Sequence, residues 1–213
     1  MANADTPFGL RPIRHRSGAA YNGAANPYFI PSTYSGGNMF IGDAVLITGT
    51  SNTAIVEVVG AGKFGIGTLP EINIAAAGDG VRISGVIVGF AADPTALENQ
   101  YRLDDTERVA FVCDDPDIVY EIQADSATTL AATAVGASFN ILLGTGSTVT
   151  GLSATELDGS DEGVDPQKQL VLTRFVNRED NDATLVHGKC EVVISTHTMT
   201  SEGSAANDGL TGI

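Results

Sequence analysis

The sequence lacks tryptophan and is poor in histidine, cysteine and basic residues, with three His, two Cys and 11 Lys plus Arg among 213 residues. Three histidines leave little material for acid–base catalysis, and the G-x-S-x-G nucleophile motif is absent. His187 and Cys190 lie three residues apart near an expected strand, but a zinc site needs two further ligands of this kind. These shortages argue against an enzyme and against a metal or other cofactor.

Long hydrophobic runs are also missing. No stretch approaches the ~18 apolar residues that a membrane span requires, and the opening MANADTPFGLRP has no apolar core of a secretory signal. We therefore expect no membrane partner and no export. In a chain without an export signal, Cys113 and Cys190 are expected to be free thiols buried in strands rather than a disulfide.

Positive charge is scarce and unevenly placed. Through Gly42 the only charged residues are Asp5, Arg11, Arg14 and Arg16, a net charge of +2. The remainder contains 25 acidic and 8 basic residues, a net charge of −17. Because so acidic a body repels nucleic-acid phosphates and anionic lipid, neither is expected as its partner.

Glycine and short β-type runs dominate what is present, with 25 glycines in the chain. In residues 107–123, two apolar runs at 109–113 and 118–122 flank an acidic Asp-Pro turn, which predicts a strand, a tight turn and a second strand. Further strands are expected at 39–48, with a bend at Gly42, then at 54–59 as its neighbour, and at 64–69, 81–90, 138–143, 148–150, 169–176 and 186–196.

One short helix is expected between Ser126, as its N-cap, and Gly136, as its stop. Residues 153–168 are expected to form the most exposed loop of the body. The predicted fold class is therefore all-β, a β-barrel or jelly-roll-like β-sandwich with one short helix. Short strands at this spacing do not distinguish between these architectures.

The N-terminal residues differ from this body. Residues 1–38 have little periodicity and contain four prolines, yet they carry several large apolar side chains. They predict an extended arm that lies on a partner or on its own body, or else an irregular packed segment. The expected organisation is an arm at 1–38, an all-β body at 39–199 and a flexible tail at 200–213, and deletion of residues 1–27 should leave a folded body.

Two further patterns have a functional and a plain interpretation. Residues 60–65, GAGKFG, match G-x-G-x-x-G after a strand, but no helix pattern follows to bind a pyrophosphate, so a hairpin turn is favoured. Two acidic groups, Asp104, Asp105, Asp114, Asp115 and Asp117, and Asp158, Asp161, Glu162 and Asp165, are weak calcium candidates. Neither group fits the EF-hand spacing, so solvated turns are the favoured interpretation. Whether one of these acidic loops binds calcium is left open.

Four stretches together resemble a known family: ANADTPFGLRPIRHRSGAAYNGAANPYFIPS at the start, then FIGDAVLI, ISGVIVGF and VCDDPDIVYEIQ. They are similar to the decoration, or cement, proteins of tailed bacteriophage heads. The resemblance implies an all-β body, frequently a homotrimer on the major capsid lattice, with an arm that reaches over capsid subunits. The arm has a suitable composition, and its capsid-contact candidates are Phe8, Leu10, Arg11, Arg14 and Arg16.

The resulting hypothesis is a non-enzymatic structural protein of a phage virion, made in the host cytoplasm and located on the capsid exterior. Its partners would be the major capsid protein and further copies of itself. The alternative is a carbohydrate- or receptor-binding β module of a phage tail or cell surface. Such modules usually expose aromatic side chains on loops, and the body offers only Tyr101 and Tyr120.

Overall fold

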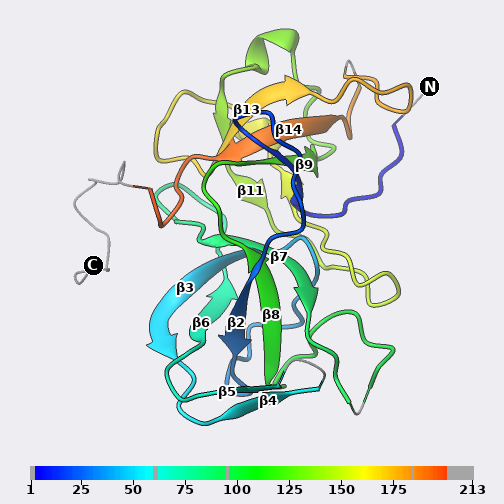
Figure 1. Ribbon diagram of the computed structural model, residues 1–213. Helices are drawn as coiled ribbons and strands as arrows, with labels where there is room; N and C mark the ends of the chain where they lie inside the picture. Colours follow the sequence, from blue (N-terminus) through cyan, green and yellow to red (C-terminus); the bar gives the residue numbers. More distant parts are fainter. Residues whose placement is uncertain (1–2, 60–61, 95, 184, 201–213) are drawn as a thin grey trace.

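The computed structural model describes residues 3–59, 62–94, 96–183 and 185–200, which form two β lobes joined at a narrow waist (Figure 1). One lobe is a closed five-stranded barrel, and the other is built on a five-stranded antiparallel sheet. The predicted all-β class is confirmed. Among the described residues, no helix reaches the length and hydropathy of a bilayer-spanning segment.

The strand bounds define the two lobes. The barrel contains β2 (Asn26–Ile30), β6 (Pro70–Ile74), β3 (Ala44–Ser51), β7 (Gly85–Phe90) and β8 (Arg108–Cys113), and a ribbon of β4 (Val56–Val58) and β5 (Gly62–Phe64) lies at its end (Figure 1). The sheet lobe contains, in order across the sheet, β1 (Arg11–His15), β9 (Ile118–Gln123), β14 (Lys189–Ile194), β13 (Leu170–Phe175) and β10 (Ser138–Phe139), with β11 (Ile141–Leu142) and β12 (Glu156–Leu157) beside it.

Residues 107–123 form the two predicted strands, but these strands do not pair with each other. β8 lies between β2 and β7 in the barrel, whereas β9 lies between β1 and β14 in the sheet lobe. Each strand has both ladder edges occupied by other strands, so neither can form the expected hairpin. The acidic turn instead carries the chain from one lobe to the other.

The N-terminal residues belong to both lobes. β1 pairs antiparallel with β9, and β2 pairs antiparallel with β8 and parallel with β6. The sequence predicted that this segment lies either on a partner or on its own body, and it lies on its own body. Position 38 does not separate it from the rest of the fold. Deletion of residues 1–27 would remove β1 and cut β2, so from the structure we expect a destabilised body in place of the folded one expected from the sequence.

Several local expectations also change. The helix expected at 126–136 is reduced to a 3-10 turn, η1 (Ala132–Ala134), because a short Thr-rich segment has little helical stability of its own. Residues 148–150 form a turn, and β4 pairs with β5 rather than with β3. β6 was not predicted; it begins at Pro70, and proline is tolerated at the first position of a strand.

Other predictions hold. β4 and β5 pair antiparallel as the favoured hairpin requires, with β5 formed by Gly62–Phe64 of the GAGKFG motif; Gly60 and Ala61 of that motif lie outside the described residues. Gly85 marks a close approach, since a Cβ there would lie 2.6 Å from the Cys113 carbonyl oxygen. Cys113 and Cys190 are free and buried, as expected. Burial raises the pKa of the Cys190 thiol to about 12.

The 153–168 segment is less exposed than expected. It contains β12 and a second 3-10 turn, η2 (Gly159–Asp161), and Ser153, Thr155 and Leu157 are buried. β12 pairs with β11, so the segment supplies part of the wall of the sheet lobe. The predicted tail falls almost entirely on residues 201–213, which lie outside the described residues.

A buried guanidinium fixes the loops at one side of the barrel. Arg102 is fully buried and donates to the carbonyl oxygens of Pro31 (3.1 Å), Tyr34 (2.8 Å), Gly37 (3.2 Å) and Thr106 (2.8 Å). Its guanidinium carbon also lies 5.2 Å from the centroid of the Tyr34 ring. One side chain thus holds residues 31–37 against the 102–106 turn.

Replacing this cation should be costly. We expect Arg102→Met to lower the free energy of unfolding by at least about 3 kcal/mol, because it leaves several buried carbonyl groups without donors. Urea denaturation followed by circular dichroism measures this loss. The control is Lys63→Met at an exposed position, which should change stability by less than about 0.5 kcal/mol. Equal effects of the two substitutions would contradict the assigned role of Arg102.

Candidate functional site

The five capsid-contact candidates lie on β1 and the residues around it. Leu10 is only 1% exposed and belongs to the core of the sheet lobe, so its side chain cannot contact another protein while the chain stays folded. This corrects its assignment as a contact residue. Phe8 is half-buried beneath the Arg11 guanidinium, 4.7 Å from it.

The basic candidates are paired within the chain. Arg11 Nη2 lies 2.7 Å from Glu121 Oε2, and Arg14 Nη2 lies 2.6 Å from Glu191 Oε2. Arg16 Nη1 lies 3.9 Å from Asp117 Oδ1 and is the most exposed of the three. Their role as capsid contacts stays a prediction, and the structure adds a role inside the fold.

That role follows from the register of the sheet. Glu121 on β9 and Glu191 on β14 are direct cross-strand partners, and like charges placed opposite each other destabilise a sheet. Arg11 and Arg178 contact Glu121, while Arg14 and Arg174 contact Glu191. Arg11 and Arg14 therefore supply half of the positive charge that offsets the repulsion between these two carboxylates.

A second polar cluster ties Asp5 and Thr6 to the end of β9. The ligand-type atoms of Asp5, Glu156 and His187 lie within 4.8 Å of one another. The amide nitrogen of the buried Gln123 lies 3.2 Å from Asp5 Oδ1, 3.0 Å from Glu156 Oε1 and 3.4 Å from His187 Nδ1. The amide has two N–H groups, so it donates to at most two of these three side chains at once, and His187 Nδ1 also lies 3.6 Å from Asp5 Oδ1.

The sequence did not indicate this cluster, because its members come from distant segments. Three of the metal candidates that it did suggest make other contacts. Asp114 accepts from Asn26 and Tyr28, Asp158 accepts from the backbone of Ser160, and the Cys190 thiol contacts the carbonyl oxygen of Gly188. These groups serve turns and the core.

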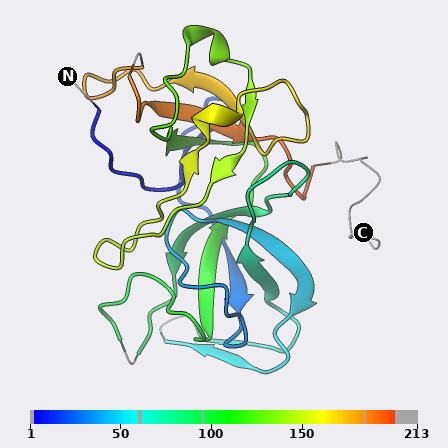
Figure 2. The same ribbon diagram turned by 180° about the vertical axis from the view of Figure 1, so that it is seen from behind.

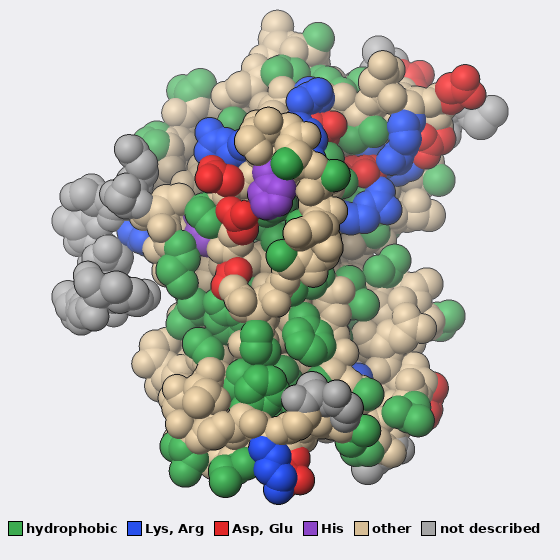
Figure 3. Space-filling view, in the orientation of Figure 1, with side chains coloured by type: hydrophobic (Ala, Val, Ile, Leu, Met, Phe, Trp, Pro, Cys, Tyr) green, Lys and Arg blue, Asp and Glu red, His purple; other side chains and the backbone are tan. Residues whose placement is uncertain are grey.

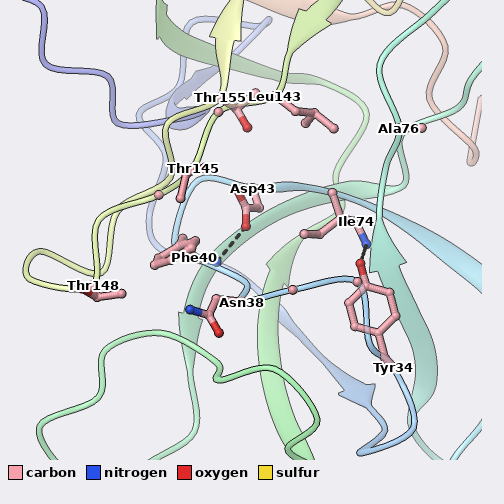
Figure 4. A pocket seen from close by; sticks show the side chains of 14 residues that line it. Tyr34, Asn38, Phe40, Asp43, Ile74, Ala76, Leu143, Thr145, Thr148 and Thr155 are labelled. Atoms are coloured by element: carbon pink, nitrogen blue, oxygen red, sulfur yellow. Dashed lines mark hydrogen bonds between the residues drawn. The ribbon is translucent and has the colours of Figure 1, made fainter.

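A pocket of about 470 Å³ lies at the waist between the lobes. Its walls come from residues 34–40 and the end of β6 on the barrel side, and from residues 143–148 and Thr155 on the sheet side. Figure 2 shows the yellow-green segment from the sheet lobe running down to this waist. In Figure 4, Asp43 lies in the middle, with Thr145 and Thr148 on one side and Tyr34 on the other.

Asp43 is the charged group of this pocket, and it is 6% exposed. Its carboxylate accepts from the Phe40 amide at 2.7 Å and from the Ser153 hydroxyl. Burial raises the pKa of Asp43, and the two hydrogen bonds oppose that rise. The sequence carries one faint signal for this residue, since Asp43 is the only acid inside the apolar 39–48 run.

The arginine network should be cooperative. We expect Arg11→Met and Arg178→Met each to cost about 1 kcal/mol, since one cation still neutralises the buried Glu121. The double variant should cost more than the sum, about 3 kcal/mol or more, because Glu121 then loses both cations. Urea unfolding of the full cycle measures the coupling. A control cycle of Arg11→Met with the distant Lys63→Met should be additive, and additivity in both cycles would refute the network.

The Glu156 cluster generates a pH-dependent expectation. Burial raises the pKa of Glu156, and Asp5 and Asp125 raise it further, while the Gln123 amide and His187 lower it. The folded chain therefore binds the proton of Glu156 more tightly than the unfolded chain does. The free energy of unfolding is then lowered as pH rises from about 4.3, the ordinary pKa of a glutamate, through the higher pKa of the folded chain. Glu156→Gln should be more stable than the parent at pH 7, with the advantage vanishing near pH 4.

Thermal melts between pH 4 and pH 8 test this expectation. The matched control is Glu162→Gln at an exposed position, whose profile should follow that of the parent. A Glu156→Gln variant that is less stable than the parent at pH 7 would show that the carboxylate is needed in its charged form.

Comparisons with protein-family models, curated proteins and solved structures find no match to this chain. Its function is therefore argued from its residues and their geometry.

Proposed function

We propose that the chain is a non-enzymatic structural protein of a tailed-bacteriophage virion, a decoration or cement protein that binds the outside of the major capsid lattice. The four stretches quoted from the sequence support this family, and the all-β body is consistent with it. One structural observation carries the proposal further, namely that the two ends of the molecule differ in surface chemistry.

The barrel end is apolar and poor in charge. Ile55, Val59 and Ile66, on and beside the β4–β5 ribbon, are 60%, 62% and 67% exposed. The ion pair of Glu57 and Lys63 lies on the same ribbon. Figure 3 shows charged side chains gathered mainly over the sheet lobe on this face, and few over the barrel lobe. Exposed apolar groups gathered in one region are typical of protein contact surfaces.

This asymmetry gives an orientation on the lattice. The barrel end contacts capsid subunits, and the acidic sheet lobe faces solvent, where like charge keeps particles apart. Attachment is assigned to the barrel end and not to the N-terminal segment, because β1 and β2 of that segment are paired within the chain. Many copies that bind only the mature lattice stabilise it by mass action, and a homotrimer multiplies the contacts of each copy.

Binding to mature heads tests the barrel end as the contact surface. We expect the double variant Ile55→Lys/Ile66→Lys to remain folded and to bind mature heads at least about tenfold more weakly, because two exposed apolar contacts become charged. Co-sedimentation with mature heads and with unexpanded procapsids measures binding. The control, Val164→Lys, changes a 94% exposed valine on the sheet lobe and should bind normally.

Each outcome separates two questions. If the parent chain does not bind mature heads, the decoration function is wrong. If the parent binds and the barrel-end variant binds equally well, the function stands and the contact surface lies elsewhere. Light scattering after size exclusion gives the absolute mass of the parent, and a trimer is the expected result.

A further inference from the structure

We propose that the pocket at the waist is a binding site for a neutral saccharide. The inference goes beyond lattice attachment, because the pocket lies between the lobes and shares no residue with the β4–β5 end of the barrel. Its volume of about 470 Å³ falls within the roughly 300–1,000 Å³ of small-molecule sites.

Charge defines which ligands the pocket can accept. Among the described residues that line it, Asp43 is the only one with a charged side chain, and no Lys, Arg or His is present. Arg102 is close to Tyr34 but fully buried, and its donors are directed at backbone carbonyl groups. A phosphate, a carboxylate or a nucleic-acid backbone would therefore meet a buried carboxylate without a counter-charge, which is strongly unfavourable.

Hydrogen-bonding capacity favours a ligand with many hydroxyl groups. In the described part of the chain, the side-chain hydroxyls of Thr145 and Thr148 and the amide nitrogen of Asn38 have no hydrogen-bond partner. Asn38 uses only its carbonyl oxygen, which accepts from the Asp104 amide at 2.9 Å. Tyr34 accepts from the Ile74 amide at 3.4 Å, which leaves its own O–H proton available as a donor.

The apolar lining complements these groups. Ile74 and Ala76 on the barrel side and Leu143 on the sheet side face the same space as the polar side chains, so the C–H groups of a sugar can contact apolar surface on either wall while its hydroxyls hydrogen-bond the polar groups beside it (Figure 4). Pockets that combine apolar surface with a few placed polar groups are the usual form of small-molecule sites. A cationic ligand is a poorer fit, because Asp43 already accepts two hydrogen bonds and Arg102 covers one face of the Tyr34 ring.

The walls are also fixed before any ligand binds. Arg102 holds the loop that carries Tyr34 and Gly37. On the other wall, a Cβ at Gly144 would lie 2.4 Å from the Ala154 carbonyl oxygen, and one at Gly146 would lie 2.4 Å from the Phe40 ring. These glycines let residues 143–146 pack directly on their neighbours, so little ordering is required on binding.

Titration of the full chain with defined sugars tests the proposal. The probes are glucose, galactose, N-acetylglucosamine and maltose, with glucose 6-phosphate and sialic acid as charged counterparts, measured by saturation-transfer NMR and calorimetry. We expect saturable binding of at least one neutral sugar at about millimolar affinity, and binding of the charged probes at least about tenfold weaker.

Variants locate the binding in the pocket. Thr145→Trp, at an exposed position on the rim, should fill the space and abolish binding, while Thr145→Val and Thr148→Val should each weaken it about three- to tenfold. The matched control Thr129→Val changes an exposed threonine outside the pocket and should leave binding unchanged.

Three results would overturn the assignment: no saturable binding of any neutral sugar, equal binding of the charged probes, or full binding by a folded Thr145→Trp variant. Lattice attachment is measured separately on mature heads with variants of the barrel end. A negative result with sugars therefore does not bear on lattice attachment, and a negative result with mature heads does not bear on sugar binding.

Discussion

The strands β8 and β9, which continue from one lobe into the other, together with their partners β2 and β1, are the constraint on which the rest of the structure depends. β8 and β9 are separated by only four residues, yet each is paired in a different lobe, and β2 and β1 follow them as antiparallel partners. The bend is held by side chains from the N-terminal strand pair: Asp114 accepts from Asn26 and Tyr28, and His15 lies 3.3 Å from Asp115. Ala44, Ile83 and Val86 of the barrel lobe belong to the same buried core cluster as residues of β9, β13 and β14, so separating the lobes would expose this shared core, and the waist is fixed. The pocket at the waist, which takes one wall from each lobe, inherits this fixed geometry.

The same constraint explains the uneven charge along the sequence. An N-terminal segment with a net charge of +2 beside a body of −17 suggested attraction to an acidic partner. The register places Glu121 opposite Glu191 in the centre of the sheet lobe, and β1 runs beside them as the edge strand. The acidic surface that attracts the arm is therefore its own sheet. Charge complementarity read from a sequence does not distinguish an intramolecular partner from another protein, because the distance between the groups depends on strand pairing.

Much of the fold could be predicted, because strand location is a local property. Alternating β-branched and apolar residues correctly indicated the β7, β8, β9, β13 and β14 regions, and glycine spacing indicated the β4–β5 turn. Strand pairing could not be predicted, since the choice between a β8–β9 hairpin and two separate sheets depends on strands up to about 100 residues away. The pocket was out of reach for the same reason. Asn38 with Asp43, Ile74 and Thr145 lie on three separate segments that only the closed barrel and its waist bring together.

The surface that is not engaged in contacts within the chain determines which other molecules the chain can bind. Its N-terminal cations are engaged with Glu121, Glu191 and Asp117, and its acidic sheet lobe repels anions. The barrel end offers exposed apolar groups with little charge to desolvate. Another protein surface is therefore the partner that it can contact at the lowest desolvation cost. A chain attached by this end keeps its waist away from the contact, so the pocket stays open to solvent. Attachment and saccharide binding would then be independent properties of the same molecule, one carried by the barrel end and the other by the joint between the lobes.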